Sequence, residues 1–283
     1  MKKVILSADS TCDLNSTLLE EYQVQIQPLH IILDEKYYQD GVDITPDDIY
    51  TTYEEEKILP QTAAPNPQEY IEHFKKWTDK GYEVVHINLG SGISSSHQNA
   101  KLAATTLPGV FVVDSGNLST GMGHLVIEAG ERIKQGKEAK TIAEEVTALK
   151  EKVCATFVLD KLTYLHAGGR CSALTALTAS VLNIKPRIDV NTADASMTVG
   201  KKFRGSLEKA VKKYIKDQLK KRKDIRTDKI IITHSGTSDE MIELVKKEVA
   251  NYMSFDEVHL TRAGCTISSH CGPNTVAIIF MTE

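Results

Sequence analysis

The sequence predicts an α/β fold, and three observations support this prediction. Short apolar runs alternate with helical patterns through the first half of the chain. Hydrophobic residues make up 41% and charged residues 25% of the chain, which is typical of a globular protein. The length of 283 residues, at roughly 100–200 residues per domain, predicts two domains. We place them at residues 1–152 and 153–283.

The elements of the first half predict a mainly parallel sheet with flanking helices. We expect strands over residues 3–8, 25–33, 83–89 and 109–114, each an apolar run that ends in polar residues. Thr45 and Pro46 suit the N-cap and first position of a helix that continues through DDIYTTYEEEK. Pro67 opens another helix, and Gly81 ends it. Three more helices are expected over residues 94–106, 119–135 and 141–152, and the proline-rich residues 59–67 are expected to form a loop.

The second half is less regular and predicts a mixed sheet with helices. Strands are expected over residues 155–159, 229–233, 257–260 and 275–281, with a β pair formed by 185–190 and 196–203. Helices are expected over residues 172–182, from Ser206 onward, and over 239–252. The Lys212–Lys223 run predicts a solvated helix face, and a docking patch for an acidic partner is the alternative.

Composition excludes several classes of function. A net charge of −4 gives no overall attraction to nucleic acid. No apolar stretch approaches the roughly 18 residues of a membrane helix, and the N-terminal apolar run is shorter than that of a signal peptide. We therefore expect a cytoplasmic protein without an integral membrane segment. Its five cysteines are expected to be reduced thiols, with a Cys265–Cys271 disulfide as the alternative.

Three loops that follow strands are rich in hydroxyl side chains. They span Ser7–Thr11, Gly90–Ser96 and Ser115–Thr120. Ligands of open α/β sheets bind beyond the carboxyl ends of strands, where helix N-termini can hold an anion. The alternative is that these residues only cap helices, because serine and threonine are favoured N-caps.

No motif in the chain matches a catalytic or cofactor template. GISSS has Ser96 in place of the second glycine of a nucleophile elbow, and there is neither a phosphate loop nor a zinc-binding HExxH. We expect no metal and no cofactor. One alternative is a serine hydrolase that acts on an acyl ester through Ser94, with His97 or His270 as the base. Its aspartate would be Asp9 or Asp114. A sensor or interaction module with another small ligand in the same cleft is a second alternative.

Taken together and in order, the motifs resemble those of the DegV family of bacterial fatty-acid-binding proteins. The likeness covers nearly the whole chain and rests on seven segments: ADSTCD (8–13), PQTAAP (60–65), SGISSSHQNA (91–100), VVDSGNLSTGMG (112–123), LHAGGR (165–170), KP (185–186) and HCGP (270–273). Ser95, Ser96 and His97 stand where the family usually has Gly-Thr-Tyr.

The resemblance implies two α/β domains with a long-chain fatty acid, such as palmitate or oleate, in a buried tunnel between them. It implies that Thr62 and Ser94 bind the carboxylate, with His270 as a third polar neighbour. It also implies a carrier rather than an enzyme. The carrier would present the acid to a partner fatty acid kinase, in lipid transport or fatty acid metabolism, and Arg170 would contact that partner. A monomer is expected by the same analogy.

Overall fold

The computed structural model describes residues 3–171 and 184–283. Within this part the chain is an α/β protein with a parallel N-terminal sheet and a mixed C-terminal sheet, as predicted. The predicted helix over 172–182 lies outside the described residues.

The N-terminal sheet has four parallel strands. Their order is β2 (Gln25–Gln27), β1 (Val4–Asp9), β6 (Glu83–Asn88) and β7 (Val110–Asp114). Successive side chains point to opposite faces, so Val84 and Val85 belong to different hydrophobic clusters. Both faces are therefore covered, as a parallel sheet requires.

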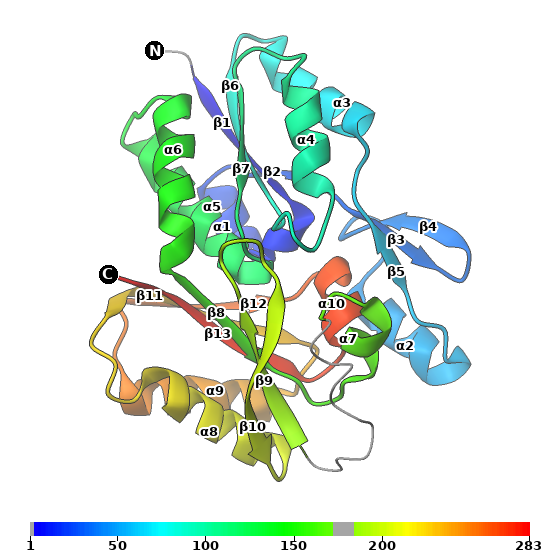
Figure 1. Cartoon of the computed structure of the whole chain (residues 1–283), viewed down its shortest axis with the longest axis vertical. Helices are drawn as coiled ribbons and strands as arrows, with labels where there is room; N and C mark the ends of the chain where they lie inside the picture. Colours follow the sequence, from blue (N-terminus) through cyan, green and yellow to red (C-terminus); the bar gives the residue numbers. More distant parts are fainter. Residues whose placement is uncertain (1–2, 172–183) are drawn as a thin grey trace.

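Helices cover the two faces of this sheet (Figure 1). One face packs against α3 (Pro67–Thr78) and α4 (Ser96–Ala104), and the other packs against α5 (Ser119–Lys134) and α6 (Ala139–Leu149). Helix α1 (Ser16–Glu21) follows the 3₁₀ turn η1 (Ser10–Cys12). The predicted helices of this half are thus present, with ends shifted by a few residues.

The C-terminal sheet has six strands. They run in the order β10 (Met197–Arg204), β9 (Ile184–Val190), β8 (Val153–Val158), β13 (Thr275–Thr282), β11 (Ile225–Ser235) and β12 (Glu257–Arg262). Only β11 and β12 pair in parallel among the described strands of this sheet. Helices α8 (Leu207–Leu219) and α9 (Asp239–Tyr252) cover one face. The other face contacts α5, so the two sheets share one core.

A small antiparallel sheet lies beside both large sheets. It consists of β4 (Lys36–Gln39), β3 (His30–Leu33) and β5 (Gln61–Ala63), and it packs with α2 (Pro46–Glu56), α7 (Thr163–Gly168) and α10 (Cys265–Cys271). Helix α10 comes from the C-terminal half but packs on elements of the N-terminal half. The division at residues 152 and 153 stays a prediction.

The predictions for residues 25–33 and 59–67 were wrong. Residues 25–33 form two strands in different sheets rather than one. Pro28, which has no backbone N–H, follows β2, and the N–H of Leu29 bonds to the Ser10 hydroxyl instead of a strand. The predicted loop over 59–67 contains β5, which pairs with β3 so that Thr62 lies opposite Ile31.

The described residues also bear on the state of the cysteines and on membrane-spanning helices. None of the five cysteines, which all lie in the described part of the chain, forms a disulfide, so the thiols are as predicted and the Cys265–Cys271 alternative is not formed. Among the described helices, none is both long and apolar enough to cross a membrane.

Candidate functional site

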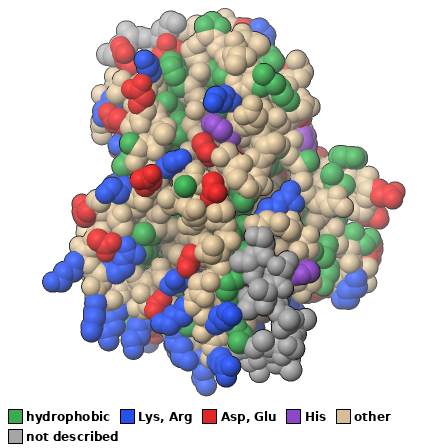
Figure 2. All heavy atoms as spheres, viewed as in Figure 1, with side chains coloured by type: hydrophobic (Ala, Val, Ile, Leu, Met, Phe, Trp, Pro, Cys, Tyr) green, Lys and Arg blue, Asp and Glu red, His purple; other side chains and the backbone are tan. Residues whose placement is uncertain are grey.

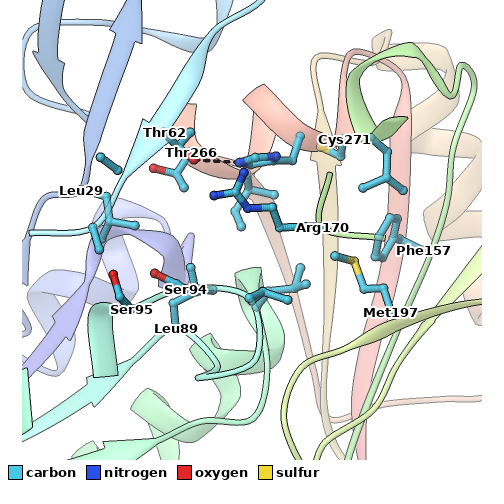
Figure 3. Close-up of a pocket in the computed structure, with 17 residues that line it drawn as sticks. Leu29, Thr62, Leu89, Ser94, Ser95, Phe157, Arg170, Met197, Thr266 and Cys271 are labelled. Atoms are coloured by element: carbon cyan, nitrogen blue, oxygen red, sulfur yellow. Dashed lines mark hydrogen bonds between the residues drawn. The ribbon is translucent and has the colours of Figure 1, made fainter. Parts of the chain in front are cut away.

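A cavity of about 340 Å³ lies where the small sheet, the loops of the parallel sheet and the mixed sheet meet. Pockets that bind small molecules commonly measure roughly 300–1,000 Å³. Figure 3 shows hydroxyl side chains of Thr62, Ser94 and Ser95 toward one side, and Phe157 and Met197 toward the other. One end of the cavity therefore carries these hydroxyls together with Leu29 and Leu89, and the other end is apolar.

All four residues singled out from the sequence line this cavity: Thr62, Ser94, Arg170 and His270. They come from four segments, namely β5, the loop before α4, the residues after α7, and α10. Their proximity is a finding of the structure, and their roles toward a ligand stay predictions.

Thr62 and His270 form a hydrogen-bonded pair. The Thr62 Oγ1 lies 2.8 Å from the Nε2 of His270. Burial, and to a smaller extent the charge of Arg170, lower the pKa of His270 to about 4. The imidazole is therefore neutral at physiological pH, and one of its nitrogens can accept a hydrogen bond while the other donates one.

Ser94 has both a local partner and access to the cavity. Its Oγ lies 2.9 Å from the Oγ of Ser96 and accepts a hydrogen bond from the Ser96 N–H at 3.1 Å. Helix α4 begins at Ser96, two residues later than expected. The N-cap of α4 is Ser95, whose side chain makes no capping bond, so Ser94 does not cap the helix, and its side chain lines the cavity.

The two positions before Arg170 each require glycine, for different structural reasons. A Cβ on Gly168 would lie 2.1 Å from the Nδ1 of His270, so only glycine leaves room for that ring. Gly169 has a φ of +65° and ends α7 in the left-handed conformation that favours glycine. The exposed Arg170 that follows donates to the Gly168 carbonyl at 2.8 Å and reaches the cavity beside the Thr62–His270 pair (Figure 3).

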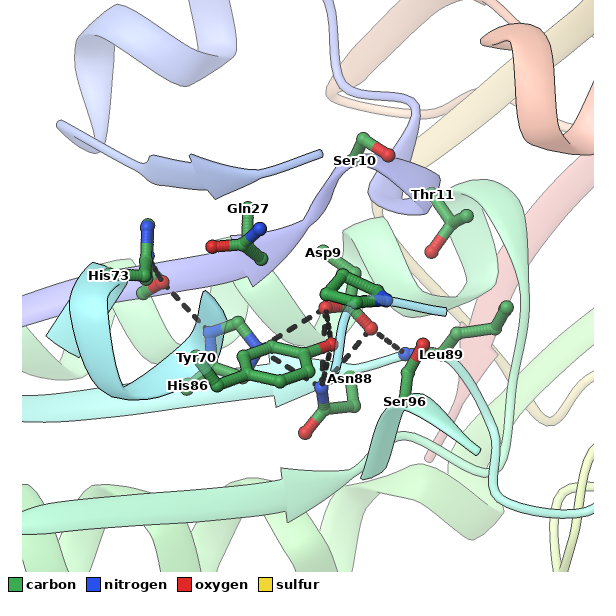
Figure 4. Close-up of polar contacts among 12 residues, drawn as sticks. Asp9, Ser10, Thr11, Gln27, Tyr70, His73, His86, Asn88, Leu89 and Ser96 are labelled. Carbon is green, nitrogen blue, oxygen red and sulfur yellow. Dashed lines mark hydrogen bonds and ion pairs between the residues drawn. The ribbon is translucent and has the colours of Figure 1, made fainter. Parts of the chain in front are cut away.

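A buried polar network lies behind the Ser94 loop (Figure 4). The carboxylate of Asp9 accepts hydrogen bonds from the Tyr70 hydroxyl at 2.7 Å and from the Leu89 N–H at 2.9 Å. The Asn88 amide donates to both of its oxygens. Asp9 is fully buried, so this network fixes the end of β6 from which the Ser94 loop departs.

Only one of the three hydroxyl-rich loops brings hydroxyls to the cavity. The loop over 90–96 contributes Ile93, Ser94 and Ser95, while the loop over 115–120 contributes only Leu118. Ser115 bonds within its own loop, and none of residues 7–11 lines the cavity. The anion-site interpretation is therefore confined to the middle loop.

Among the described residues, the serine, histidine and aspartate candidates of the hydrolase alternative do not form a hydrogen-bonded triad. The hydroxyl of Ser94 bonds to Ser96, and His270 bonds to Thr62. Asp9 is held within the buried network, and Asp114 accepts hydrogen bonds from Ser91. A serine nucleophile needs a histidine base within hydrogen-bond reach, and that base needs an orienting carboxylate.

A second, smaller cavity of about 40 Å³ continues from the apolar end. The two cavities share the side chains of Leu118, Phe157, Ile267 and Cys271. These residues separate a larger chamber from a narrow extension between α5 and the mixed sheet. The sequence did not identify them, because an apolar residue that faces a cavity has the same pattern as one that faces the core.

A basic face lies outside the cavity. Lysine and arginine side chains gather over the face formed by α8 and β10 (Figure 2). Some of them pair locally, as Lys212 does with Glu208 at 2.8 Å and Lys201 with Asp217 at 2.5 Å.

Within the described part of the chain, no cluster of three or more His, Cys, Asp or Glu residues could hold a metal ion.

Comparison with known proteins identifies the family. Residues 3–283 match the family model described as "Uncharacterised protein, DegV family". The chain belongs to the DegV family. A DegV domain-containing protein of Clostridium perfringens is 32% identical over the full length of both chains.

Solved DegV structures have the same fold. A DegV family protein from Thermus thermophilus, described by its fatty acid binding, is 26% identical, with a TM-score of 0.87 over 99% of this chain and 100% of that one. A fatty acid binding DegV family protein from Streptococcus agalactiae is 25% identical, with a TM-score of 0.85 over 100% of both chains. The resemblance inferred from the motifs is thereby confirmed at the level of family and fold.

Proposed function

We propose that this protein binds one long-chain fatty acid, such as palmitate or oleate, and presents its carboxylate to a partner fatty acid kinase. In this proposal the chain acts as a cytoplasmic carrier, a monomer rather than an enzyme. The observation that carries the proposal is a single cavity with hydroxyl and imidazole groups at one end and apolar side chains at the other. Fatty acid binding by the Thermus and Streptococcus relatives supports it.

The polar end suits a carboxylate. If His270 Nε2 donates to Thr62 Oγ1, the threonine hydroxyl hydrogen is free to donate to the ligand. Ser94 then supplies a second hydroxyl, and Arg170 adds positive charge at the cavity mouth. A carboxylate left without donors in an apolar cavity would be strongly destabilised, so this group of donors sets the orientation of the acid.

The apolar end suits an acyl chain. Burial of each methylene contributes about 0.8 kcal/mol, so a chain of roughly 16 carbons gains on the order of 10 kcal/mol before entropic costs. Leu118, Phe157 and Ile267 line the path from the larger cavity into the smaller one. The tail would follow this path between α5 and the mixed sheet.

The arrangement also suits a carrier whose ligand is modified while bound. The hydroxyls of Thr62 and Ser94 are neutral donors, and they hold a carboxylate without a tight ion pair that would oppose its phosphorylation. Arg170, the one charged group among the described residues that line the cavity, is exposed and therefore accessible to a partner.

Lipid extraction tests the binding step. Native protein should release a fatty acid that mass spectrometry identifies, and delipidated protein should bind oleate in a calorimetric titration. Ser94→Ala should weaken this binding, while Ser91→Ala, a change in the same loop outside the cavity, should not. Folded, delipidated protein that binds neither palmitate nor oleate would refute the proposal. Hydrolysis of an ester dye that Ser94→Ala abolishes would favour the hydrolase instead.

A further inference from the structure

Two buried carboxylates hold the first turn of α10. Asp13 Oδ1 accepts a hydrogen bond from the Gly264 N–H at 2.8 Å. Asp40 accepts one from the Cys265 N–H at 2.7 Å and one from the Thr266 N–H at 3.2 Å. Asp13 is 5% exposed and Asp40 is 4% exposed. Three backbone donors of α10 therefore depend on side chains from the N-terminal half.

Helix α10 is also the wall of the candidate site. It carries Thr266, Ile267 and His270, which all line the larger cavity. With seven residues it is too short to be stable without tertiary contacts, because isolated helices shorter than about 12–15 residues are marginal. The contacts at its first turn thus determine where His270, near its other end, meets Thr62.

The same carboxylates reach two more segments of the cavity wall. Asp13 Oδ2 accepts a hydrogen bond from the Ser119 hydroxyl at 2.5 Å, next to Leu118 in the wall. Asp40 Oδ2 accepts one from the Ser10 hydroxyl at 2.9 Å, and the Ser10 oxygen accepts one from the N–H of Leu29, another wall residue. The two aspartates therefore tie three parts of the wall together.

The two carboxylates lie close together without a counter-ion. A Cβ on Gly264 would be 3.1 Å from Asp13 Oδ1 and 3.2 Å from Asp40 Oδ1. No Lys, Arg or His among the described residues forms an ion pair with either aspartate. Arg262 of the neighbouring β12 pairs with Asp47, at 3.0 Å.

The other titratable groups that interact with Asp13 or Asp40 are the thiols of Cys12, Cys265 and Cys271, and Arg262 lies near the thiol of Cys265. Burial raises the pKa of Asp13 to about 8; the Ser119 and Gly264 hydrogen bonds oppose this rise, and the charge of Asp40 adds to it. Two carboxylates that share a buried site do not both ionise readily. Asp13 therefore takes up a proton at a higher pH than an ordinary aspartate does.

We propose that Asp13 and Asp40 are positioning residues whose hydrogen bonds to the first turn of α10 hold that helix and its His270 in the ligand-binding arrangement. The inference rests on the proposed fatty acid function. Loss of the Asp13 proton at alkaline pH leaves a buried negative charge beside Asp40 at the first turn of α10, and this charge loosens the wall. Ligand affinity then falls with rising pH.

The pH profile of oleate binding tests the pairing. Loss of one required proton predicts that the wild-type Kd rises roughly tenfold between about pH 7 and about pH 9. Asp13→Asn keeps an acceptor for the Gly264 N–H and a donor for Ser119 but cannot ionise, so its profile should be flat. Asp34→Asn, at an exposed aspartate, should keep the wild-type profile. A wild-type slope in Asp13→Asn would overturn the proposal, because a purely structural role predicts no difference in slope.

A second readout does not need the ligand. In ligand-free protein, the NMR signal of the His270 ring should shift with a midpoint near the pKa of about 8 of Asp13, and Asp13→Asn should abolish this shift. Asp40→Asn places an amide N–H₂ against one of the α10 N–H groups, so that hydrogen bond is lost. This variant should displace the His270 signal at every pH. If the NMR signal of His270 shifts with pH as expected but oleate does not bind, the fatty acid function fails and the positioning role stands. If the His270 signal is independent of pH from about 7 to about 9, the positioning role fails.

Discussion

The imidazole of His270 lies 2.8 Å from the hydroxyl of Thr62, although 208 residues separate them in the chain. One belongs to the helix of the HCGP motif and the other to a strand of the PQTAAP motif. Their meeting joins two halves of the sequence at the polar end of one cavity. The first prediction concerns this pair.

Thr62→Val keeps the shape of the side chain and removes the hydroxyl. We expect weaker oleate binding by about 1–3 kcal/mol, because a buried polar group would lose its partner. Thr62→Ser restores the hydroxyl and should bind within a few-fold of wild type. Calorimetric titration of delipidated protein measures both. Equal affinity of the valine and serine variants would remove Thr62 from the site.

Gly168→Ala should displace His270, because the new Cβ would lie 2.1 Å from Nδ1 of the ring. We expect a lower melting temperature and weaker ligand binding. The control is the same substitution in a His270→Ala background, where the clash is absent and the added cost should nearly vanish. A double-mutant cycle measures this coupling. Additive effects would show that the glycine is required for another reason.

Arg170→Ala removes the exposed charge at the cavity mouth. Because exposed ion pairs contribute only about 0–1 kcal/mol, oleate affinity should change by a few-fold at most. Phosphorylation of bound oleate by a fatty acid kinase should fall much further, and Arg170→Lys should recover part of it. The variant should also show a higher pKa for His270, since the charge of Arg170 lowers it. Full kinase turnover by Arg170→Ala would contradict the presenting role.

Acid should destabilise the protein partly through His270. Burial lowers its pKa in the folded protein to about 4, while the ordinary value is 6.5. Between these two values the unfolded chain binds more protons, so the free energy of unfolding decreases as pH falls through this window. His270→Gln should therefore lose less stability than wild type between about pH 7 and about pH 5 in urea unfolding. Parallel losses in the two proteins would show that His270 is not held neutral.

Phe157 should control how far an acyl chain can extend, because its side chain lines both cavities. Phe157→Leu should increase the preference for longer over shorter saturated acids by opening the path into the smaller cavity. Relative affinities for a series of chain lengths measure this effect, with Met197→Leu as a matched control at the larger cavity alone. An unchanged chain-length profile would place the tail elsewhere.

The sequence predicted most strands and helices because their signals are local. Thr45 caps α2 and Ser206 caps α8, each by a bond to a nearby backbone N–H, and both were identified from the pattern. Strand β5 was missed because its three residues pair with a partner distant in sequence. Pairing of this kind has no short-range signature.

The polar residues of the candidate site were identified through motif resemblance, whereas the apolar lining was not. Phe157 and Ile267 alternate with core residues on ordinary elements, and only the packing of the two sheets decides which of them face empty space. Asp13 belongs to the ADSTCD motif, but its partner Gly264 lies 251 residues away, so its contact with α10 could not be predicted.

A crystal structure of the delipidated protein soaked with oleate tests the central claim most directly. We predict that the carboxylate lies within hydrogen-bond distance of the Thr62 and Ser94 hydroxyls, with the chain running past Phe157 between α5 and the mixed sheet. Oleate bound elsewhere, or a cavity that stays without lipid at saturating oleate, would contradict the account.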